Sequence, residues 1–327
     1  MKDTIQHRDG IRLTLSNNTE IVFDGDAPSD VTVLSHAHGD HLLNNSARAV
    51  TSELTAALSN VRQSEQTLTT TTHPTVELFR AGHIAGSRAA RVTDPQTGRT
   101  YLYTGDFTTR SRLYIEGFTP IEADVLITET TYGKPAYRFP PIAESLEQIH
   151  TWLEETMDTV VILFGYALGR AQKIQHILSH SSRSRVFITD AIDQLNETIS
   201  SHRDLSFDAR LYDADVELRE GDALVLPMST GRISWIESLV ERTGAITAGF
   251  SGWAIDDSFI YQRGVDKGFV LSDHCDFDEL VGLVESVDPE MVYTTHGFTE
   301  TFAQYLTKHH GYDARALKQN QSTLTEF

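Results

Sequence analysis

Two patterns of hydrophobic and polar positions alternate along this chain. Short runs of β-branched and other apolar residues are typical of buried strands, and they occupy residues 31–35, 100–107, 123–130, 159–166, 185–190, 223–228, 268–276 and 290–297. Apolar residues spaced by three or four positions indicate helices at 51–60, 142–157, 167–181, 233–244, 277–287 and 299–310. This alternation of strands and helices predicts an α/β fold.

Polar residues lie at the ends of four of the predicted strands. They are Asp106, Glu129, His274 and His296. Folds of the α/β class build their sites at strand ends, where side chains from several strands meet. We therefore expect these four side chains to contribute to one site, although they are far apart in the sequence.

The composition and the charge are those of a large folded protein with an acidic surface. The 327 residues are 39% hydrophobic, and no apolar run approaches the ~20 residues that a membrane helix needs. The one cysteine, Cys275, excludes an internal disulfide and is typical of a reducing cytoplasm. A net charge of −19 does not attract nucleic acid in general, so a nucleic-acid substrate would have to be recognised by a specific site.

The first candidate chemistry lies in the segment SHAHGDHL, residues 35–42. His36 and His38 are two positions apart, so on an extended segment they point in the same direction. Gly39 permits a sharp turn before Asp40 and His41. Imidazole and carboxylate ligands suit zinc, with manganese as the alternative. This loop is predicted to present two histidines to one metal ion and an Asp–His pair to a second.

Two later motifs supply ligands that a two-metal site still needs. The segment AGHIAGS contains His83, and YTGDF contains Asp106. Both residues have small neighbours, which leave room for a metal ion, and a carboxylate is a suitable bridge between two ions. With all three segments present in this order, a chance surface cluster of histidines is a poor explanation.

These three segments resemble the motifs of the metallo-β-lactamase superfamily, whose fold is an αβ/βα four-layer sandwich with a dinuclear metal centre. The resemblance implies that His36, His38 and His83 hold one metal ion. It implies that Asp40 and His41 hold the other and that Asp106 bridges the two. Because this fold hosts many chemistries, the resemblance to the superfamily does not identify a substrate.

The second half of the chain resembles the β-CASP nuclease branch of that superfamily. ITETTYGKP with Glu129, LSDHCD with His274 and VYTTHG with His296 are similar to its three motifs. The 144 residues between Glu129 and His274 are too many for a loop and contain strand and helix patterns. The resemblance implies an inserted β-CASP domain at 167–243, within a discontinuous metallo-β-lactamase domain formed by 1–166 and 244–327. The segments GYALGRAQKI and GFSGWA are similar to the small ligase-associated DNA exonucleases, which are also labelled mRNA 3′-end-processing-factor-like exonucleases.

The resemblance also implies a mechanism. Two divalent ions, with zinc preferred, hold a bridging hydroxide that attacks the phosphodiester, and Asp40 and Asp106 are catalytic as well as metal ligands. His296 completes the coordination of the second ion. His274 is the general acid, and Glu129 orients it and keeps it protonated. We predict that nucleic acid is contacted by Arg170, Lys173, Lys134, Arg138, Ser87 and Ser251.

The leading hypothesis is a cytoplasmic, metal-dependent exonuclease that acts on DNA, with a ligase or a helicase as a possible partner. An RNA 3′-end-processing ribonuclease is the alternative, because both enzymes cleave the same diester and the motifs do not separate them. A small-molecule metallo-hydrolase is a more distant alternative, since such enzymes lack an insert of this size and the pair of Glu129 and His274. A non-enzymatic scaffold is disfavoured because every expected ligand is present.

Overall fold

The chain forms two compact units, which are described separately. The computed structural model describes residues 4–63, 67–213, 215–228 and 234–318. The first unit comprises Met1–Ser111, Ile115–Arg138 and His274–Phe327. The second comprises Arg112–Tyr114 and Phe139–Asp273.

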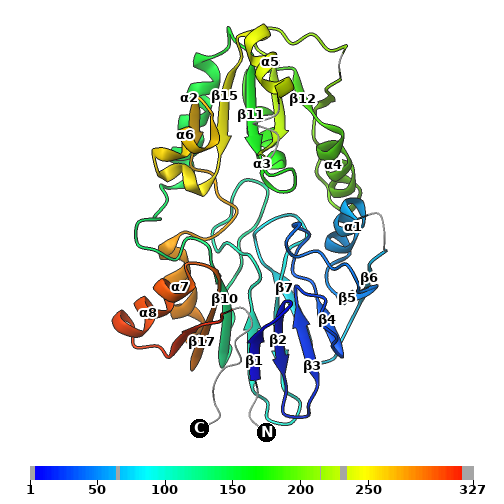
Figure 1. Ribbon diagram of the computed structural model, residues 1–327, viewed down its shortest axis with the longest axis vertical. Helices are drawn as coiled ribbons and strands as arrows, with labels where there is room; N and C mark the ends of the chain where they lie inside the picture. Colours follow the sequence, from blue (N-terminus) through cyan, green and yellow to red (C-terminus); the bar gives the residue numbers. More distant parts are fainter. Residues whose placement is uncertain (1–3, 64–66, 214, 229–233, 319–327) are drawn as a thin grey trace. The chain divides into compact units, whose positions relative to one another are not determined.

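The first unit contains two six-stranded sheets (Figure 1). Across one sheet the order is β1 (Thr4–His7), β2 (Ile11–Thr14), β3 (Glu20–Phe23), β4 (Val31–Val33), β5 (Arg48–Val50) and β6 (Thr69–Thr71). Across the other it is β18 (Ala314–Ala316), β17 (Met291–Gly297), β10 (Val125–Thr130), β9 (Thr100–Tyr103), β8 (Arg88–Thr93) and β7 (Val76–Arg80). Strands β3 and β4 are parallel, as are β9, β10 and β17. The residues that follow these strands therefore emerge at the same edge of their sheet.

The layers follow from the alternation of side chains along the strands. Leu13, Tyr103 and Ile127 belong to one buried cluster that joins the facing sides of the two sheets. On the outer side of the second sheet, Leu102 and Leu126 pack against α7 (Phe277–Val287) and α8 (Thr299–His309). On the outer side of the first sheet lies α1 (Glu53–Arg62), whose Ala56 packs with Leu34. This helix–sheet–sheet–helix arrangement confirms the predicted four-layer sandwich.

The second unit is a parallel six-stranded sheet covered by helices. Its strand order is β13 (Arg210–Leu211), β12 (Val186–Ile188), β14 (Ala223–Pro227), β11 (Val161–Gly165), β15 (Ile246–Phe250) and β16 (Lys267–Phe269). Its helices are α2 (Ile142–Glu155), α3 (Arg170–Leu178), α4 (Asp190–His202), α5 (Ser234–Thr243), α6 (Ser258–Arg263) and the short 3₁₀ helix η2 (Gly252–Ile255). Alternate residues of β11 enter two separate hydrophobic clusters, Val161 in one and Ile162 in the other, which shows that both faces of this sheet are covered.

The predicted insert, 167–243, lies inside this second unit, and its exact bounds stay a prediction. Residue 233, the first of the helix predicted at 233–244, lies outside the described residues, and the helix itself is α5. Within the described part of the chain, no helix has both the length and the apolar composition needed to cross a bilayer.

Two predicted strands end clearly earlier than expected. The run at 100–107 predicts a strand that reaches Asp106, but β9 ends at Tyr103, so Asp106 lies in the following loop. The apolar run at 268–276 predicts a strand that extends to His274, but β16 ends at Phe269. The following backbone has contacts other than a regular strand ladder. Arg112 donates a hydrogen bond to the carbonyl oxygen of Ser272 at 2.8 Å, and the backbone N–H of Cys275 donates to the carbonyl oxygen of Phe107 at 2.9 Å. The segment that carries His274 is therefore a loop.

A buried ionic cluster in the second unit holds the end of that loop. Nζ of Lys173 lies 2.6 Å from one carboxylate oxygen of Asp273, and the guanidinium of Arg170 lies 2.8 Å from the other. All three side chains are buried, and burial lowers the pKa of Lys173 although Asp273 opposes that shift. Arg170 and Lys173, two of the residues predicted to contact nucleic acid, thus bind a carboxylate inside the protein.

Removal of one partner from this cluster should destabilise the second unit. We expect Lys173→Ala to lower the free energy of unfolding by about 3–5 kcal/mol, because it leaves Asp273 buried with half of its compensation. Urea denaturation monitored by tryptophan fluorescence measures this loss. Arg219→Ala, which removes an exposed pair with Glu217 in the same unit, is the control and should cost less than about 1 kcal/mol. Equal losses in the two variants would contradict the interpretation.

Candidate metal centre

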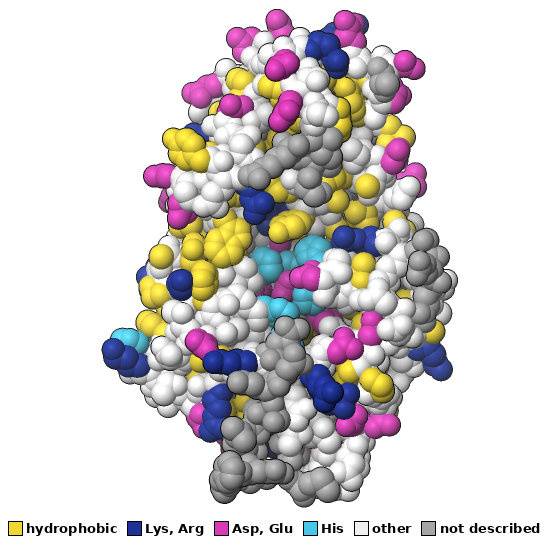
Figure 2. Space-filling view, viewed as in Figure 1, with side chains coloured by type: hydrophobic (Ala, Val, Ile, Leu, Met, Phe, Trp, Pro, Cys, Tyr) yellow, Lys and Arg dark blue, Asp and Glu magenta, His cyan; other side chains and the backbone are white. Residues whose placement is uncertain are grey.

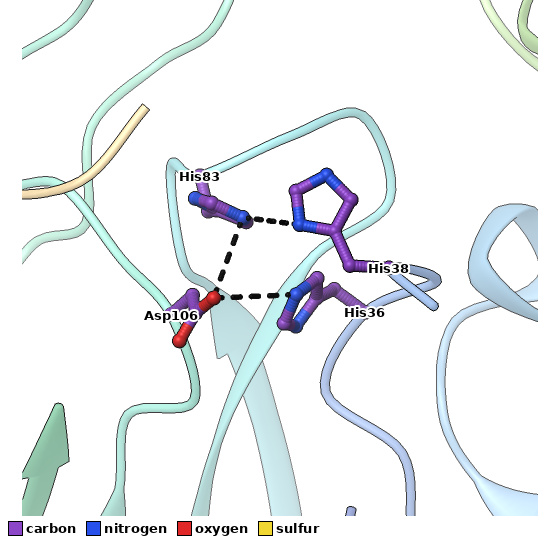
Figure 3. A group of neighbouring side chains, drawn as sticks. All are labelled: His36, His38, His83 and Asp106. Carbon is purple, nitrogen blue, oxygen red and sulfur yellow. Dashed lines mark hydrogen bonds and ion pairs between the residues drawn. The ribbon is translucent and has the colours of Figure 1, made fainter. Parts of the chain in front are cut away.

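Three histidine rings meet where the loop after β4 faces the loop after β7. His36 and His38 come from the first loop and His83 from the second. The centroids of each pair of rings lie 4.8 Å apart, and Nε2 of His83 is 3.1 Å from Nδ1 of His38 (Figure 3). Two segments that are distant in the sequence therefore direct three imidazoles toward one point.

The carboxylate of Asp106 faces this point from the loop after β9. Its Oδ2 lies 3.4 Å from Nε2 of His36 and 3.7 Å from Nε2 of His83 (Figure 3). The same oxygen lies 3.8 Å from Nε2 of His41. One carboxylate oxygen thus faces the three-histidine group and His41 at once. The role of Asp106 as a bridge between two ions stays a prediction.

The approach of Asp106 depends on the glycine that precedes it. Gly105 has a φ of +55°, and a Cβ at this position would lie 2.6 Å from Cβ of Ser35. Only a residue without a side chain allows the loop after β9 to pass so close to the loop after β4. The glycine of the GDF motif is therefore required by packing.

The hydrogen bonds of His36 direct a lone pair toward the centre of the cluster. The hydroxyl of Ser35 donates its one proton to Asp24 at 2.5 Å, so it must accept a hydrogen bond from Nδ1 of His36, which lies 2.9 Å away. This selects the tautomer in which Nε2 has no proton. Nε2 is buried, and no described residue provides it with a hydrogen-bond partner. Burial, followed by the neighbouring histidines, also lowers the pKa of His36 far below its usual value, so the ring is neutral.

Asp24 also orients His41. The sequence analysis identified His41 as a candidate ligand but did not identify Asp24. Its Oδ2 accepts hydrogen bonds from Nδ1 of His41 at 2.9 Å and from the hydroxyl of Tyr103 at 2.8 Å. This bond turns Nε2 of His41 toward Asp106. Asp24 directly follows β3, so the same signal that selected Asp106 and Glu129, a carboxylate after a buried strand, was present at this position too. A carboxylate behind a histidine ligand is a common support of metal sites.

The other residues predicted for the second ion lie around His41. Oδ2 of Asp40 is 3.8 Å from Nε2 of His41, and the side chain of Asp40 is 78% exposed. The ring of His296, from the end of β17, has its centroid 5.5 Å from that of His41. The loops after β4 and β9 and the end of β17 therefore converge on a second group beside the first.

His274 and Glu129 form a close pair next to the cluster. Nδ1 of His274 lies 2.8 Å from Oε1 of Glu129, and the ring centroids of His274 and His83 are 4.6 Å apart. The backbone N–H of Phe107 donates to Oε1 of Glu129 at 3.2 Å, and the hydroxyl of Thr131 donates to Oε2. The carboxylate is thus fixed from three sides, and it in turn fixes the orientation of the imidazole.

The electrostatics of the cluster favour bound cations. Burial and the nearby Glu129 raise the pKa of Asp106, although the surrounding histidines oppose that shift. Burial acts in the same direction on Glu129, but His274 and the hydrogen bonds lower its pKa overall. Histidine and acidic side chains gather at one place on the surface (Figure 2). Cations at this place would relieve the cost of two neighbouring buried carboxylates and would use the free lone pair of His36, so these residues fit a metal centre.

Comparisons with known proteins identify relatives of this chain. No family model matches the chain. A protein of Opitutus terrae named "Probable DNA ligase" is 32% identical over 314 residues, which are 91% of this chain and 30% of that protein. "Probable RNase MJ4" of Methanocaldococcus jannaschii is 24% identical over 291 residues, 73% of this chain and 66% of the relative. This chain thus spans less than two thirds of either relative.

A solved structure, of a protein of unknown function from Enterococcus faecalis, covers 99% of this chain and 100% of its own, with a TM-score of 0.65 at 13% identity. This likeness shows the fold. The decisive observation is that the relatives of this chain, taken together, fall within the metallo-β-lactamase/β-CASP group. The chain belongs to the β-CASP branch of the metallo-β-lactamase superfamily.

β-CASP proteins are metal-dependent. In this chain, the histidine and acidic residues that could hold metal ions lie together in the first unit. Ligand atoms of His36, His38, His83 and Asp106 all lie within 4.8 Å of one another. Asp24, His36 and His41 form a second such group, and Asp106, Glu129 and His274 form a third. The assignment of individual ligands to two ions stays a prediction.

The residues predicted to contact nucleic acid have partners within the protein. Nζ of Lys134 lies 3.9 Å from the ring centroid of Phe298, and Nε of Arg138 donates to Asp278 at 2.8 Å. Ser87 is buried and donates to the carbonyl oxygen of Ile84 at 2.9 Å, whereas Ser251 accepts from the backbone N–H of Trp253 at 3.3 Å. Arg170 and Lys173 are the buried cations described above. The predicted contacts of all six residues with nucleic acid stay predictions.

The bond between Asp24 and His41 predicts how the stability of the metal-free protein depends on pH. Burial by itself would lower the pKa of His41, but the carboxylates, with Asp24 foremost, raise it to about 10. The unfolded value is about 6.5, so this stabilisation is complete below pH 6.5 and is lost as the pH rises to about 10. In the presence of a chelator, the Tm of the wild type should fall over this window more steeply than that of Asp24→Asn.

The control for this experiment is Asp26→Asn. Asp26 accepts hydrogen bonds from the backbone N–H groups of Asn44 and Asn45 and, among the described residues, forms no hydrogen bond or ion pair with His41, so its variant should keep the pH slope of the wild type. Equal slopes for Asp24→Asn and the wild type would refute the proposed coupling.

Proposed function

We propose that this chain is a metal-dependent phosphodiesterase that degrades nucleic acid from an end, with DNA as the favoured substrate. The observation that carries the proposal is the convergence of two groups of imidazoles on one oxygen of Asp106, beside the pair of His274 and Glu129. A phosphodiester needs charge neutralisation at its oxygens and a proton for the leaving oxygen, and this arrangement supplies residues for both tasks.

In this proposal, one ion is held by His36, His38 and His83, and the other by Asp40, His41 and His296. Asp106 contacts both. The nitrogen and oxygen donors suit zinc, with manganese as the alternative. When bound, a pair of divalent cations lowers the pKa of water to near neutrality and polarises a phosphoryl oxygen.

The residues of the chain itself position the proton donor. His274 directs Nδ1 toward Glu129, which leaves Nε2 as the nitrogen that delivers a proton to the leaving oxygen. Glu129 remains ionised because its hydrogen bonds and His274 lower its pKa, and an ionised partner keeps the imidazole protonated. No serine or cysteine nucleophile is required in this mechanism.

The preference for DNA is supported by the relative of Opitutus terrae that is named a probable DNA ligase. That name also supports a ligase as a functional partner. The relative of Methanocaldococcus jannaschii named a probable RNase favours the alternative, an RNA-processing ribonuclease. The chain has one cysteine, the buried Cys275, which supports a cytoplasmic location. A small-molecule metallo-hydrolase stays the distant alternative.

Two alanine variants separate the roles of proton donor and metal ligand. We expect His274→Ala to retain both metal ions and to lose about 10²–10⁴-fold in kcat, which is the usual contribution of a general acid. Asp40→Ala should lose metal as well as activity, because it removes a ligand. Metal content by mass spectrometry, measured beside kcat on the same samples, provides both readouts. His73→Ala, a histidine outside the cluster, is the control. Equal metal depletion in the first two variants would rule out the general-acid role.

The substrate is tested with end-labelled single-stranded DNA and RNA of the same sequence, incubated with the metal-loaded protein. We expect the DNA to be shortened stepwise from one end and the RNA to be degraded at least ~10-fold more slowly, since the 2′-hydroxyl changes the shape of the strand. Faster degradation of the RNA would select the ribonuclease alternative. Internal cuts in both substrates would exclude exonuclease action, and no cleavage of either would overturn the proposal.

A further inference from the structure

The pairing of β10 with β17 contains an extra residue at the active site. Thr128 pairs with Thr294 and Glu129 with Thr295, but Thr130 pairs with Gly297. His296 is thus left without a partner in the ladder, which defines a β-bulge. Bulges change the direction of a side chain and are frequent beside active sites.

The backbone at this bulge has a conformation that histidine rarely adopts. His296 has a φ of +50°, in the left-handed region that favours glycine. Gly297 follows with a φ of +71°, and a Cβ there would lie 2.4 Å from the carbonyl oxygen of Thr130. Strain of this kind persists only where the surroundings enforce it. The neighbouring strand must therefore hold His296 in place.

Thr130 makes the contacts that hold the bulge. Its buried hydroxyl donates a hydrogen bond to the carbonyl oxygen of His296 at 2.5 Å. The carbonyl oxygen of Thr295 lies 3.3 Å from the same hydroxyl and also accepts from it. Its own carbonyl oxygen accepts from the backbone N–H of Phe298 at 2.9 Å. One residue of β10 therefore binds the bulged strand before and after the strained position.

The bulge lies between two functional side chains. Glu129, the partner of His274, is the residue before Thr130 on β10. His296 is the extra residue on β17, and its ring lies 5.5 Å from that of His41. In a regular ladder, side chains alternate between the two faces of the sheet. The side chain at position 296 would then point to the face opposite to that of Thr295. The extra residue removes that constraint.

We propose that Thr130 is a positioning residue, whose hydroxyl maintains the left-handed bulge that directs His296 toward the second metal ion. This inference rests on the proposed function, in which His296 is a ligand of that ion. It assigns to a threonine inside the TETTY segment a role in metal binding without direct contact with the metal.

The test compares Thr130→Val, which keeps the shape of the side chain, with Thr130→Ser, which keeps the hydroxyl. Calorimetric titration of the metal-free protein with Zn²⁺ measures the two binding steps. We expect the second step to weaken by ~10–100-fold in Thr130→Val, as is usual when a supporting group of a metal ligand is lost, and the first to stay unchanged. Thr130→Ser should stay within about 2-fold of the wild type by the same reasoning.

The matched control is Thr294→Val. Thr294 is a buried threonine of β17, the strand of His296, and its hydroxyl donates to the carbonyl oxygen of Thr299 at 3.0 Å. The Thr294→Val variant should bind both ions with the same affinities as the wild type. Wild-type binding by Thr130→Val would overturn the inference, and so would weaker binding by Thr294→Val to the same degree.

A second measurement is independent of metal and does not require Thr130→Val to fold. If His296 is held in the left-handed region, His296→Gly should have a higher urea midpoint than His296→Ala in the metal-free protein. In a regular strand the order is the opposite, because glycine is the less stable residue there. A higher midpoint for the alanine variant would refute the inference.

The failure of this inference is distinguishable from that of the proposed function. A wild-type protein that binds both ions but cleaves no nucleic acid would refute the proposed function alone. A wild-type protein that binds a single ion would refute the ligand role of His296 and, with it, the role of Thr130.

Discussion

The central constraint of this molecule is a buried carboxylate, Asp106, surrounded by imidazole nitrogens. Each of these groups has been removed from water, and the nearby Glu129 makes the negative charge of Asp106 more costly. Neutral imidazoles with free lone pairs, such as that of His36, do not compensate for this charge. Divalent cations do, because they accept the lone pairs and neutralise the carboxylates together. The fold of the first unit provides a rigid frame for an arrangement that is unfavourable without ions.

That frame consists of parallel strands with their ends at the same edge. Strands β3 and β4 end near Asp24 and the loop of His36, and β9, β10 and β17 end near Asp106, Glu129 and His296. The side chains that approach the cluster are held in turn by others. Asp24 acts on two histidines, one directly and one through Ser35. Much of the support is thus provided by hydroxyl and carboxylate groups behind the residues that face the centre.

Buried charge has a different role in the second unit. Arg170 and Lys173 start a helix that follows a buried strand, where basic residues are expected to face solvent or a phosphate. Both instead contact Asp273, the last residue of that unit before His274. Compared with apolar residues of similar volume, such a buried cluster adds little net stability to the folded state. Any arrangement that separated the partners would leave a buried charge unpaired, which is costly. The cluster defines where the chain leaves the second unit.

The sequence by itself determined the α/β class, eight of the eighteen described strands, six of the eight described α-helices, and the residue types of the candidate metal centre. These features are local: periodicity reports which side of an element is buried, and closely spaced histidines share a loop. Tertiary structure alone decided the rest. It paired Asp24 with His41, buried Lys173, ended β16 before His274 and gave His296 its left-handed backbone. A carboxylate after a buried strand marked Asp24 as a site residue, but nothing local indicated its partner or the other three features. Each depends on contacts between residues remote in sequence, and burial and strain exist only once those contacts have formed.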